Sequence, residues 1–557
     1  MIEWVQKRDG RVVPFNAAKI ADAIFSAARA VGGEDRRQSE FLAGQVIHLL
    51  SQSLPEGGTP QVEQIQDLVE KVLIENGHAR TAKAYILYRN RRTRIREQKS
   101  ELMDAVSEVL QDSINELSDQ STPAAKLSRI ALAASEQYTL HSLLPREFSL
   151  AHQRAEIHID RLPHYTMAVA AGVIRPATLV RHGISIGQMH LAAARTPEQL
   201  MRMAGQLVLL AHSEMIGELL FSDLDCAVAQ VVKLADQPFS AVEAELLAER
   251  MLHDLGLVAQ IGGLCPIRVS VSIGLERSNS GTIFAKALLA VLARGLPRRT
   301  LAHTPQVVLQ LRSSDPVSAQ LRQLAAPVAR EGGNPAQVMV SERSGAIFAS
   351  GLHLATGEPG QLAQSFVNLP RIALEASSSS DFWAGIDRVY SLVARQLAHR
   401  FEVLSALSEH DLPLLWQLAG AGEQQYQAMK DVLQACQLSI VPVGVTEAFA
   451  VARMRFGSQI GLEEQEFIHL QRRIVEHWRS HYALQLKLAA TAGSWAASRF
   501  RQVDGQAFPL VNSLWPEVEQ PYQLAPVSQH FQGGQLVVQP LPERPMVDVV
   551  YAAPLSH

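Results

Sequence analysis

Residues 5–20 read Val-Gln-Lys-Arg-Asp-Gly-Arg-Val-Val-Pro-Phe-Asn-Ala-Ala-Lys-Ile, and this stretch sets the structure expected for the start of the chain. Asp9-Gly10 lies between two short apolar segments, a pattern typical of a β-hairpin, because glycine accepts the positive φ of such turns. Asn16 is a good N-cap for the helix that follows, whose apolar face continues to Gly32-Gly33. The sequence therefore predicts a hairpin followed by an amphipathic helix.

Four cationic side chains gather around this turn and the first turn of the helix: Lys7, Arg8, Arg11 and Lys19. Clustered lysine and arginine side chains near a helix N-terminus bind polyanions, because they donate charge-assisted hydrogen bonds. The alternative is that these cations form only a solvated hairpin face. The surrounding pattern favours the first interpretation, a site for phosphates.

The whole chain of 557 residues is too long for one ordinary core, and two or three domains are expected. A net charge of −4 argues against general binding to nucleic acid or to a membrane surface. Cys226, Cys265 and Cys436 are far apart and form no CxxC pair, so we expect neither a disulfide framework nor a zinc site. We find no signal peptide and no apolar run that could span a bilayer, which predicts a cytoplasmic protein.

Apolar periodicity divides the chain into two parts. Residues 1–98 read as the hairpin plus helices, with Thr59-Pro60 expected to begin one of them. The remainder, 101–557, is helix-rich and contains short strand-like runs at residues 266–273, 306–311 and 365–369. Strand-like runs separated by long helices favour an α/β layer or barrel with mixed strand directions.

The first part resembles an ATP-cone, the small regulatory domain at the front of many ribonucleotide reductases. The residues that carry the resemblance are Val5, Lys7-Arg8-Asp9-Gly10, Phe15, Asn16 and Lys19-Ile20, and it extends to the helix with Tyr85-Ile-Leu-Tyr-Arg89. It implies an α+β nucleotide-binding domain over residues 1–98, with ATP or dATP as an allosteric ligand. The residues implied in nucleotide binding are Lys7, Arg8, Asn16, Lys19, Thr59 and Arg91.

The second part resembles the catalytic subunit of anaerobic (class III) ribonucleotide reductases. Six segments are similar to segments of that family and occur in its order: residues 143–159, 265–274, 365–372, 441–447, 490–500 and 533–534. The resemblance implies a ten-stranded α/β barrel over residues 101–557. It also implies a residual substrate pocket with Asn368 and Glu447, although buried hydrogen bonds alone would explain both residues.

The parts that the family uses for radical chemistry are not found in this sequence. The family stores a radical on a glycine near its C-terminus, relays it to a cysteine on a finger loop, and holds a structural zinc with four cysteines. Residues 535–557 contain neither glycine nor cysteine, and the candidate finger loop, residues 342–350, contains no sulfur. Asp160-Arg161 stands where the family has His-Asp, and Thr446 where it has Asn. We therefore expect no catalytic residue of this kind, no zinc and no other metal.

The resulting interpretation is a regulatory or accessory homologue of anaerobic ribonucleoside-triphosphate reductase, catalytically inactive, that binds ATP or dATP in deoxyribonucleotide metabolism. A homodimer or an intact reductase subunit are its candidate partners, and neither nucleic acid nor membrane is expected. The first alternative is a divergent or split reductase whose radical loop comes from a second polypeptide. The second is a nucleotide-sensing repressor, which the lack of a zinc ribbon or strongly basic domain disfavours.

Overall fold

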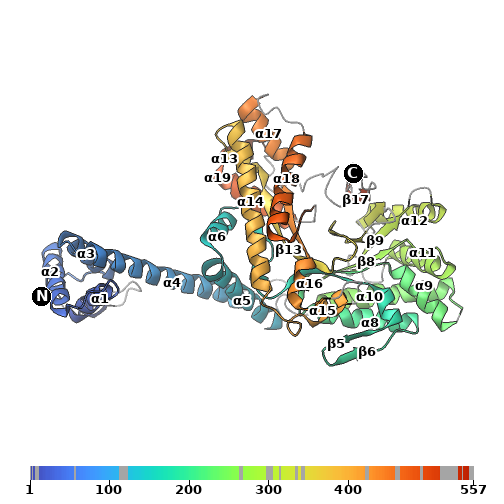
Figure 1. Ribbon diagram of the computed structural model, residues 1–557, viewed down its shortest axis with the longest axis horizontal. Helices are drawn as coiled ribbons and strands as arrows, with labels where there is room; N and C mark the ends of the chain where they lie inside the picture. Colours follow the sequence, from blue (N-terminus) through green and yellow to red (C-terminus); the bar gives the residue numbers. More distant parts are fainter. Residues whose placement is uncertain are drawn as a thin grey trace. The chain divides into compact units, whose positions relative to one another are not determined.

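The computed structural model divides into two compact units, Met1–Asp112 and Ser113–His557 (Figure 1). The structure describes residues 2, 4–6, 12–54, 58–111, 123–236, 238–261, 267–295, 305–312, 315–332, 336–339, 345–420, 426–457, 464–489, 494–514, 537–541 and 544–550.

The first unit is the expected hairpin followed by four helices. Strands β1 (Trp4–Gln6) and β2 (Val12–Pro14) pair antiparallel, and the helices are α1 (Ala18–Arg29), α2 (Arg36–Ser53), α3 (Val62–Glu75) and α4 (Ala79–Gln111). Each helix contributes to one apolar core, in which Ile24, Val46 and Leu73 are at most 1% exposed. Helix α4 continues past residue 98, where the sequence predicts the end of the domain.

The start of α3 corrects one prediction. The helix begins at Val62 with Gln61 as its N-cap, and not at Thr59-Pro60. The reason is a contact with the hairpin, because the carbonyl oxygen of Pro60 accepts a hydrogen bond from the amide of Gln6 at 2.9 Å. Gln61 has extended backbone and forms a parallel bridge with Gln6 of β1, which places the exposed Thr59 next to the hairpin.

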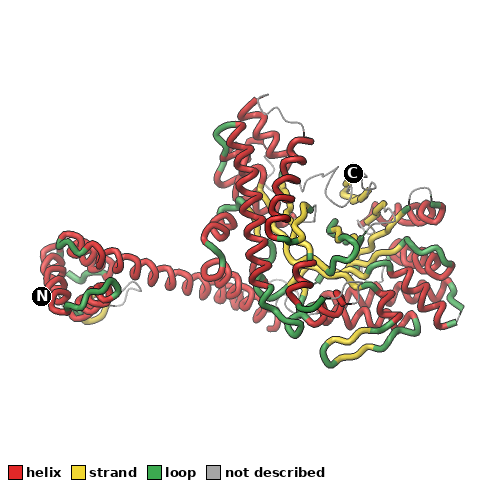
Figure 2. The backbone as a smooth tube through the Cα atoms, in the orientation of Figure 1, coloured by secondary structure: helices red, strands yellow, loops and turns green. Residues whose placement is uncertain are grey.

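The second unit is built on one curled sheet of eleven strands (Figure 2). Its order is β15-β14-β13-β4-β7-β8-β9-β10-β17-β16, with β3 beside β13. The strands are β3 (Ile157–Ile159), β4 (Val169–Ile174), β7 (Met215–Phe221), β8 (Arg268–Ile273), β9 (Gln306–Leu311), β10 (Ala336–Met339), β13 (Gly360–Asn368), β14 (Gln437–Val443), β15 (Gln485–Leu488), β16 (Val537–Leu541) and β17 (Arg544–Val550). The three strand-like runs of the sequence are found in β8, β9 and β13.

Strand direction divides this sheet into two parallel groups. Strands β13, β14 and β15 form one group, and β4, β7, β8, β9, β10 and β17 form the other. The groups meet where β13 pairs antiparallel with β4. Mixed strand directions were expected, whereas the closed ten-stranded barrel is not confirmed, because among the described strand pairs none joins β15 to β16.

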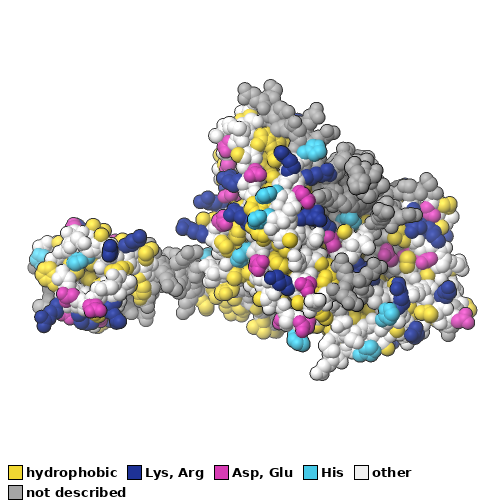
Figure 3. All heavy atoms as spheres, viewed as in Figure 1, with side chains coloured by type: hydrophobic (Ala, Val, Ile, Leu, Met, Phe, Trp, Pro, Cys, Tyr) yellow, Lys and Arg dark blue, Asp and Glu magenta, His cyan; other side chains and the backbone are white. Residues whose placement is uncertain are grey.

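Helices alternate with these strands along the chain. They are α5 (Pro123–Tyr138), α6 (Arg146–Gln153), α7 (Pro176–Arg181), α8 (Pro197–Ala211), α9 (Leu224–Ala235), α10 (Ala241–Ile261), α11 (Asn279–Arg294), α12 (Pro316–Gly332), α13 (Leu369–Glu375), α14 (Ser379–Leu404), α15 (Pro413–Gly420), α16 (Met429–Ala435), α17 (Val445–Phe456), α18 (Glu464–Tyr482), α19 (Ser494–Ala507) and α20 (Pro509–Leu514). In the described part of the chain, no helix has the length and apolar character needed to cross a membrane. Lys and Arg side chains are scattered among Asp and Glu on the face shown in Figure 3.

The two faces of the β4 group differ in chemistry. In β7, Leu219 and Phe221 belong to the large apolar core, whereas Glu218 and Leu220 point to the other face, as the alternation of a strand requires. A short hairpin, β11 (Ala346–Ile347) and β12 (His353–Leu354), covers this second face. The second face is therefore partly polar and carries its own small apolar cluster.

Glycine is required where the two groups meet. Gly360 is the register partner of Gly172, and a Cβ atom on Gly360 would meet the carbonyl oxygen of Ala171 well inside contact distance. A Cβ on Gly172 would meet only the flexible end of the Met215 side chain in β7. The close approach of β13 and β4 thus depends on the absence of a side chain at Gly360.

We expect Gly360→Ala to lower the free energy of unfolding of this unit by about 1–3 kcal/mol, because the backbone must shift to admit a methyl group. Gly205→Ala in α8 is the matched control, since its Cβ meets nothing within 4 Å. It should be neutral or stabilising by about 0.5–1 kcal/mol. Calorimetric melting of the full chain measures both, and equal melting temperatures for the two variants would contradict the steric argument.

Candidate functional sites

The first candidate site lies on the hairpin unit. Asn16 accepts a hydrogen bond from the amide of Ala18 at 2.9 Å, although Ala17 and not Asn16 occupies the N-cap position. Lys19, in the first turn of α1, is exposed, and so is Thr59 beside β1. Lys7 and Arg8 lie outside the described residues, and of Arg91 only the backbone, in α4, is described. The structure thus places Thr59 at the hairpin and leaves Lys7, Arg8 and the Arg91 side chain to prediction.

Cations of this unit differ in their availability. Arg89 donates to Asp67 and Glu70 at 2.7 Å each, and Arg36 donates to Asp22 at 2.7 Å. Their charges are already compensated by carboxylates. No described carboxylate lies within 4 Å of the ammonium group of Lys19. Lys19 is therefore an exposed cation of the first helical turn whose charge is available to an incoming phosphate.

A second candidate site lies where β13 and β14 end. Asn368, the last residue of β13, is the register partner of Val443 at the end of β14. Glu447 lies in the first turn of α17, directly after β14, and is 6% exposed. Because the strands are parallel, these two predicted pocket residues lie at the same edge of the sheet, and α13 packs against α17 there (Figure 1).

Asn368 is fully buried and its amide group is fully used. Its oxygen accepts from the amide of Arg371 and caps α13, while its nitrogen donates to the carbonyl of Ala155 and to Asp504, both at 2.9 Å. Arg371 in turn forms an ion pair with Asp504 at 2.9 Å. These contacts show a structural role for Asn368, joining the end of β13 to α19. Asp504 has no counterpart in the sequence predictions, since nothing near it marks a buried aspartate.

Two histidines connect the segment before the sheet to α19. His152 accepts from the amide of Ile159 at 3.2 Å, and His158 packs against Trp495 with ring centroids 4.5 Å apart. The guanidinium of Arg499 donates to the carbonyl of His152 at 2.6 Å. Burial, together with the charge of Arg499, lowers the pKa of His152 to about 3 and that of His158 to about 2. Both rings are therefore neutral at physiological pH.

A third candidate site is the hairpin β11–β12 against the sheet. Phe348, Leu352 and Leu354 pack on Ala171, Val173 and Leu220, the inner residues of β4 and β7. At the tip, the amide of Ala349 donates to the carboxylate of Glu218 at 3.2 Å, and the hydroxyl of Ser270 donates to the same carboxylate. Glu218 is 2% exposed, and sequence patterns did not single it out. The hairpin thus presents three buried apolar residues and a backbone amide to the sheet.

The two described cysteines lie in a helix or at a helix end outside this hairpin. Cys226 is half-buried in α9, Cys436 is buried at the end of α16, and neither forms a disulfide. Burial raises the pKa of both thiols well above the usual range, so both are protonated. Cys265 lies outside the described residues. Among the residues that the structure describes, no group of three or more His, Cys, Asp or Glu side chains could hold a metal ion.

Comparison with known families agrees with this architecture. The sequence profile of the anaerobic ribonucleoside-triphosphate reductases matches residues 115–528, and that of the ATP cone domain matches residues 3–94. The chain belongs to the anaerobic ribonucleoside-triphosphate reductase family. An ATP cone precedes its reductase-like part.

Relatives of this reductase-like chain are distant but cover most of it. The anaerobic ribonucleoside-triphosphate reductase of Salmonella typhimurium is 24% identical over 572 residues, 92% of this chain and 79% of its own length. That of Escherichia coli is 23% identical over 573 residues, with the same two shares. The Thermotoga maritima anaerobic ribonucleotide reductase in complex with dATP and CTP superposes with a TM-score of 0.59 at 15% identity, covering 78% of this chain and 83% of its own. The structural likeness confirms the fold.

We expect Asn368→Ala to destabilise the reductase-like unit by about 2–4 kcal/mol, because it removes a helix cap and leaves Asp504 and a buried carbonyl without their donor. Asn16→Ala, which removes an exposed hydrogen bond, serves as the matched control and should cost at most about 1 kcal/mol. Thermal melting of both variants measures the difference. An unchanged melting temperature for Asn368→Ala would contradict the structural role and leave ligand binding as the remaining explanation for Asn368.

Proposed function

We propose that this chain binds ATP or dATP on its ATP cone and acts as a regulatory or accessory member of the family, without reducing ribonucleotides by itself. The observation that carries the proposal is the tip of the β11–β12 hairpin. It stands in the segment expected to form the finger loop, and its residues Phe348, Ala349 and Ser350 offer no thiol for a radical relay. Hydrogen abstraction from ribose needs such a relay, because ordinary acid–base groups do not carry it.

Nucleotide binding by the cone is supported by the exposed Lys19, by the position of Thr59 beside β1, and by the profile match over residues 3–94. The sites proposed for the nucleotide are Lys7, Arg8, Asn16, Lys19, Thr59 and Arg91. A related reductase of Thermotoga maritima has been solved with dATP in its specificity site, so nucleotide effectors act on members of this fold.

The second candidate function is a divergent or split reductase that receives its radical loop from another polypeptide. It is favoured by the polar residues on the second face of the sheet, the face that the β11–β12 hairpin covers. The buried polar residues there are Glu218, Ser270, Ser272 and Gln310. A face intended only for packing would hold apolar residues at these positions. The two functions differ in whether added components restore turnover.

The remaining assignments complete the proposal. The reductase-like part closes as a ten-stranded barrel, and Asn368 and Glu447 border its residual pocket. It carries no zinc, its partner is a second copy or an intact reductase subunit, and it works in the cytoplasm without nucleic acid or membrane.

We expect Lys19→Ala in the full chain to weaken ATP and dATP binding by about 1.5–3 kcal/mol, the value of a charge-assisted hydrogen bond to phosphate. Lys71→Ala is the matched control, because Lys71 is an exposed helical lysine that faces Glu75 at 3.8 Å. Calorimetric titration of the wild type and both variants measures the affinities. Equal affinities in the wild type and Lys19→Ala would assign Lys19 to a solvated surface.

We expect no deoxyribonucleotide and no glycyl-radical EPR signal when the purified chain is incubated anaerobically with a radical-SAM activase and ribonucleoside triphosphates. An intact family member treated in parallel provides the positive control. Turnover by this chain alone would refute the accessory role. Turnover only after addition of a small glycine-loop polypeptide would establish the split reductase.

A further inference from the structure

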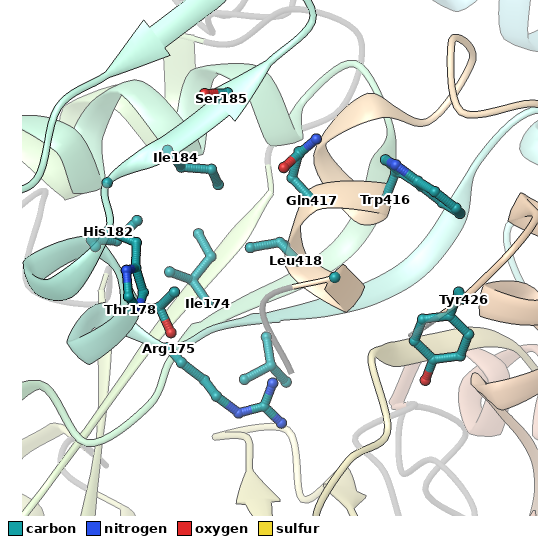
Figure 4. A pocket seen from close by; sticks show the side chains of 14 residues that line it. Ile174, Arg175, Thr178, His182, Ile184, Ser185, Trp416, Gln417, Leu418 and Tyr426 are labelled. Atoms are coloured by element: carbon teal, nitrogen blue, oxygen red, sulfur yellow. The ribbon is translucent and has the colours of Figure 1, made fainter. Parts of the chain in front are cut away.

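A cavity of about 560 Å³ lies at the carboxyl end of β4, lined by residues of α7, β5 (Ile184–Ile186) and α15 (Figure 4). None of the residues proposed above for nucleotide binding lines it. Its volume falls in the range of small-molecule sites, and ligands in open α/β sheets bind outside the carboxyl ends of strands. Its location therefore marks a site separate from the ATP cone.

The lining combines one cation with aromatic and amide groups. Arg175 follows β4 directly, and its charge acts on the pKa of Tyr426 across the cavity (Figure 4). Trp416 and Gln417 come from α15 on the opposite wall, while Ile174 and Leu418 form an apolar middle. Aromatic rings accept a planar ring by stacking, and an amide side chain both donates to and accepts from the edge of a heterocycle.

The charge of Arg175 is only partly compensated. Among the described residues no carboxylate lies within 4 Å of its guanidinium. Asp223 is close enough for Arg175 to act on its pKa, but burial is the larger effect and raises that pKa. A half-buried arginine that pairs with none of the described carboxylates is suited to bind one anionic group of a ligand.

The wall that carries Trp416 and Gln417 is held in place by a buried carboxylate. Glu214, which is 2% exposed, accepts from the amides of Leu414 and Leu415 at 2.7 and 3.0 Å. Two such bonds fix the start of α15 relative to the end of α8. The cavity is thus preformed, which lowers the entropic cost of binding a ligand.

We propose that this cavity binds a nucleoside monophosphate, with the phosphate on Arg175, the base against Trp416 and Tyr426, and its edge on Gln417. A single arginine matches a single phosphate, whereas a triphosphate requires a larger cationic cluster such as that expected on the ATP cone. An aromatic ring without phosphate would leave Arg175 unused. The cavity volume accommodates one base with its sugar and phosphate.

Calorimetric titration of the full-length Lys19→Ala variant with AMP, adenosine and inorganic phosphate tests the proposal. The Lys19→Ala background weakens the proposed cone site, and the cavity substitutions below assign the AMP binding that remains, so a failure of the cone proposal is distinguishable from a failure of this one. We expect saturable binding of AMP, with adenosine and inorganic phosphate each weaker by at least about tenfold. No AMP binding, or adenosine binding as tightly as AMP, would overturn the proposal.

Two further substitutions locate the site. Arg175→Gln should weaken AMP binding about 10- to 100-fold while adenosine binding stays unchanged, and Arg202→Gln, at an exposed position of α8, is its matched control. Gly420→Phe should abolish binding of both ligands, because Gly420 lines the cavity and its added side chain meets nothing within 4 Å at the Cβ. This variant tests the cavity without removing a charged group. AMP binding that survives both Arg175→Gln and Gly420→Phe would place the ligand elsewhere and overturn the proposal.

Discussion

The antiparallel pairing of β13 with β4 is the contact on which the rest of the sheet depends. All nine residues of β13 are buried, and the strand pairs with β14, β3 and β4 at once. The pairing requires glycine at position 360, because a side chain there would meet the backbone carbonyl oxygen of Ala171 in β4. Since the two groups run in opposite directions, the carboxyl ends of one group lie beside the amino ends of the other. Asn368 ends one group at one edge, and Arg175 follows the other group at the opposite edge.

Buried polar contacts then hold the helices to these strand ends. Asn368 binds Asp504 and the carbonyl of Ala155, and Gln364 of the same strand donates to Asp160 at 2.7 Å. Glu214, directly before the amino end of β7, holds the start of α15 in the corresponding way. Each contact satisfies groups that would be costly to bury alone, so each also selects one arrangement of its helix.

The proposed role of this chain rests on the second face of the sheet, which the β11–β12 hairpin covers. The hairpin β11–β12 covers β4 and β7 with apolar side chains, and its tip is held through Glu218. A reactive thiol at such a tip would be poised for radical transfer, whereas Phe348, Ala349 and Ser350 offer packing and hydrogen bonds. The proposed role treats fold and reaction as separable, because the fold rests on strand pairing and the reaction on a few side chains. The ATP cone has its own apolar core, separate from the core of the reductase-like unit.

The sequence by itself determined the elements whose cause is local. Asp9-Gly10 and the apolar segments on either side predict the hairpin that β1 and β2 form. Apolar periodicity predicts α1 and the strands β8, β9 and β13. The start of α3 was misplaced, because a bond from Gln6 to Pro60, 54 residues later (60 − 6), overrides the local helix signal. Only the tertiary structure brought Asn368 to Asp504, 136 residues apart, and Ala349 to Glu218, 131 residues apart. It likewise assembled the cavity from residues 173–185 and 416–426. Such contacts depend on which strands pair and how helices return across the sheet, and no pattern of neighbouring residues encodes that choice.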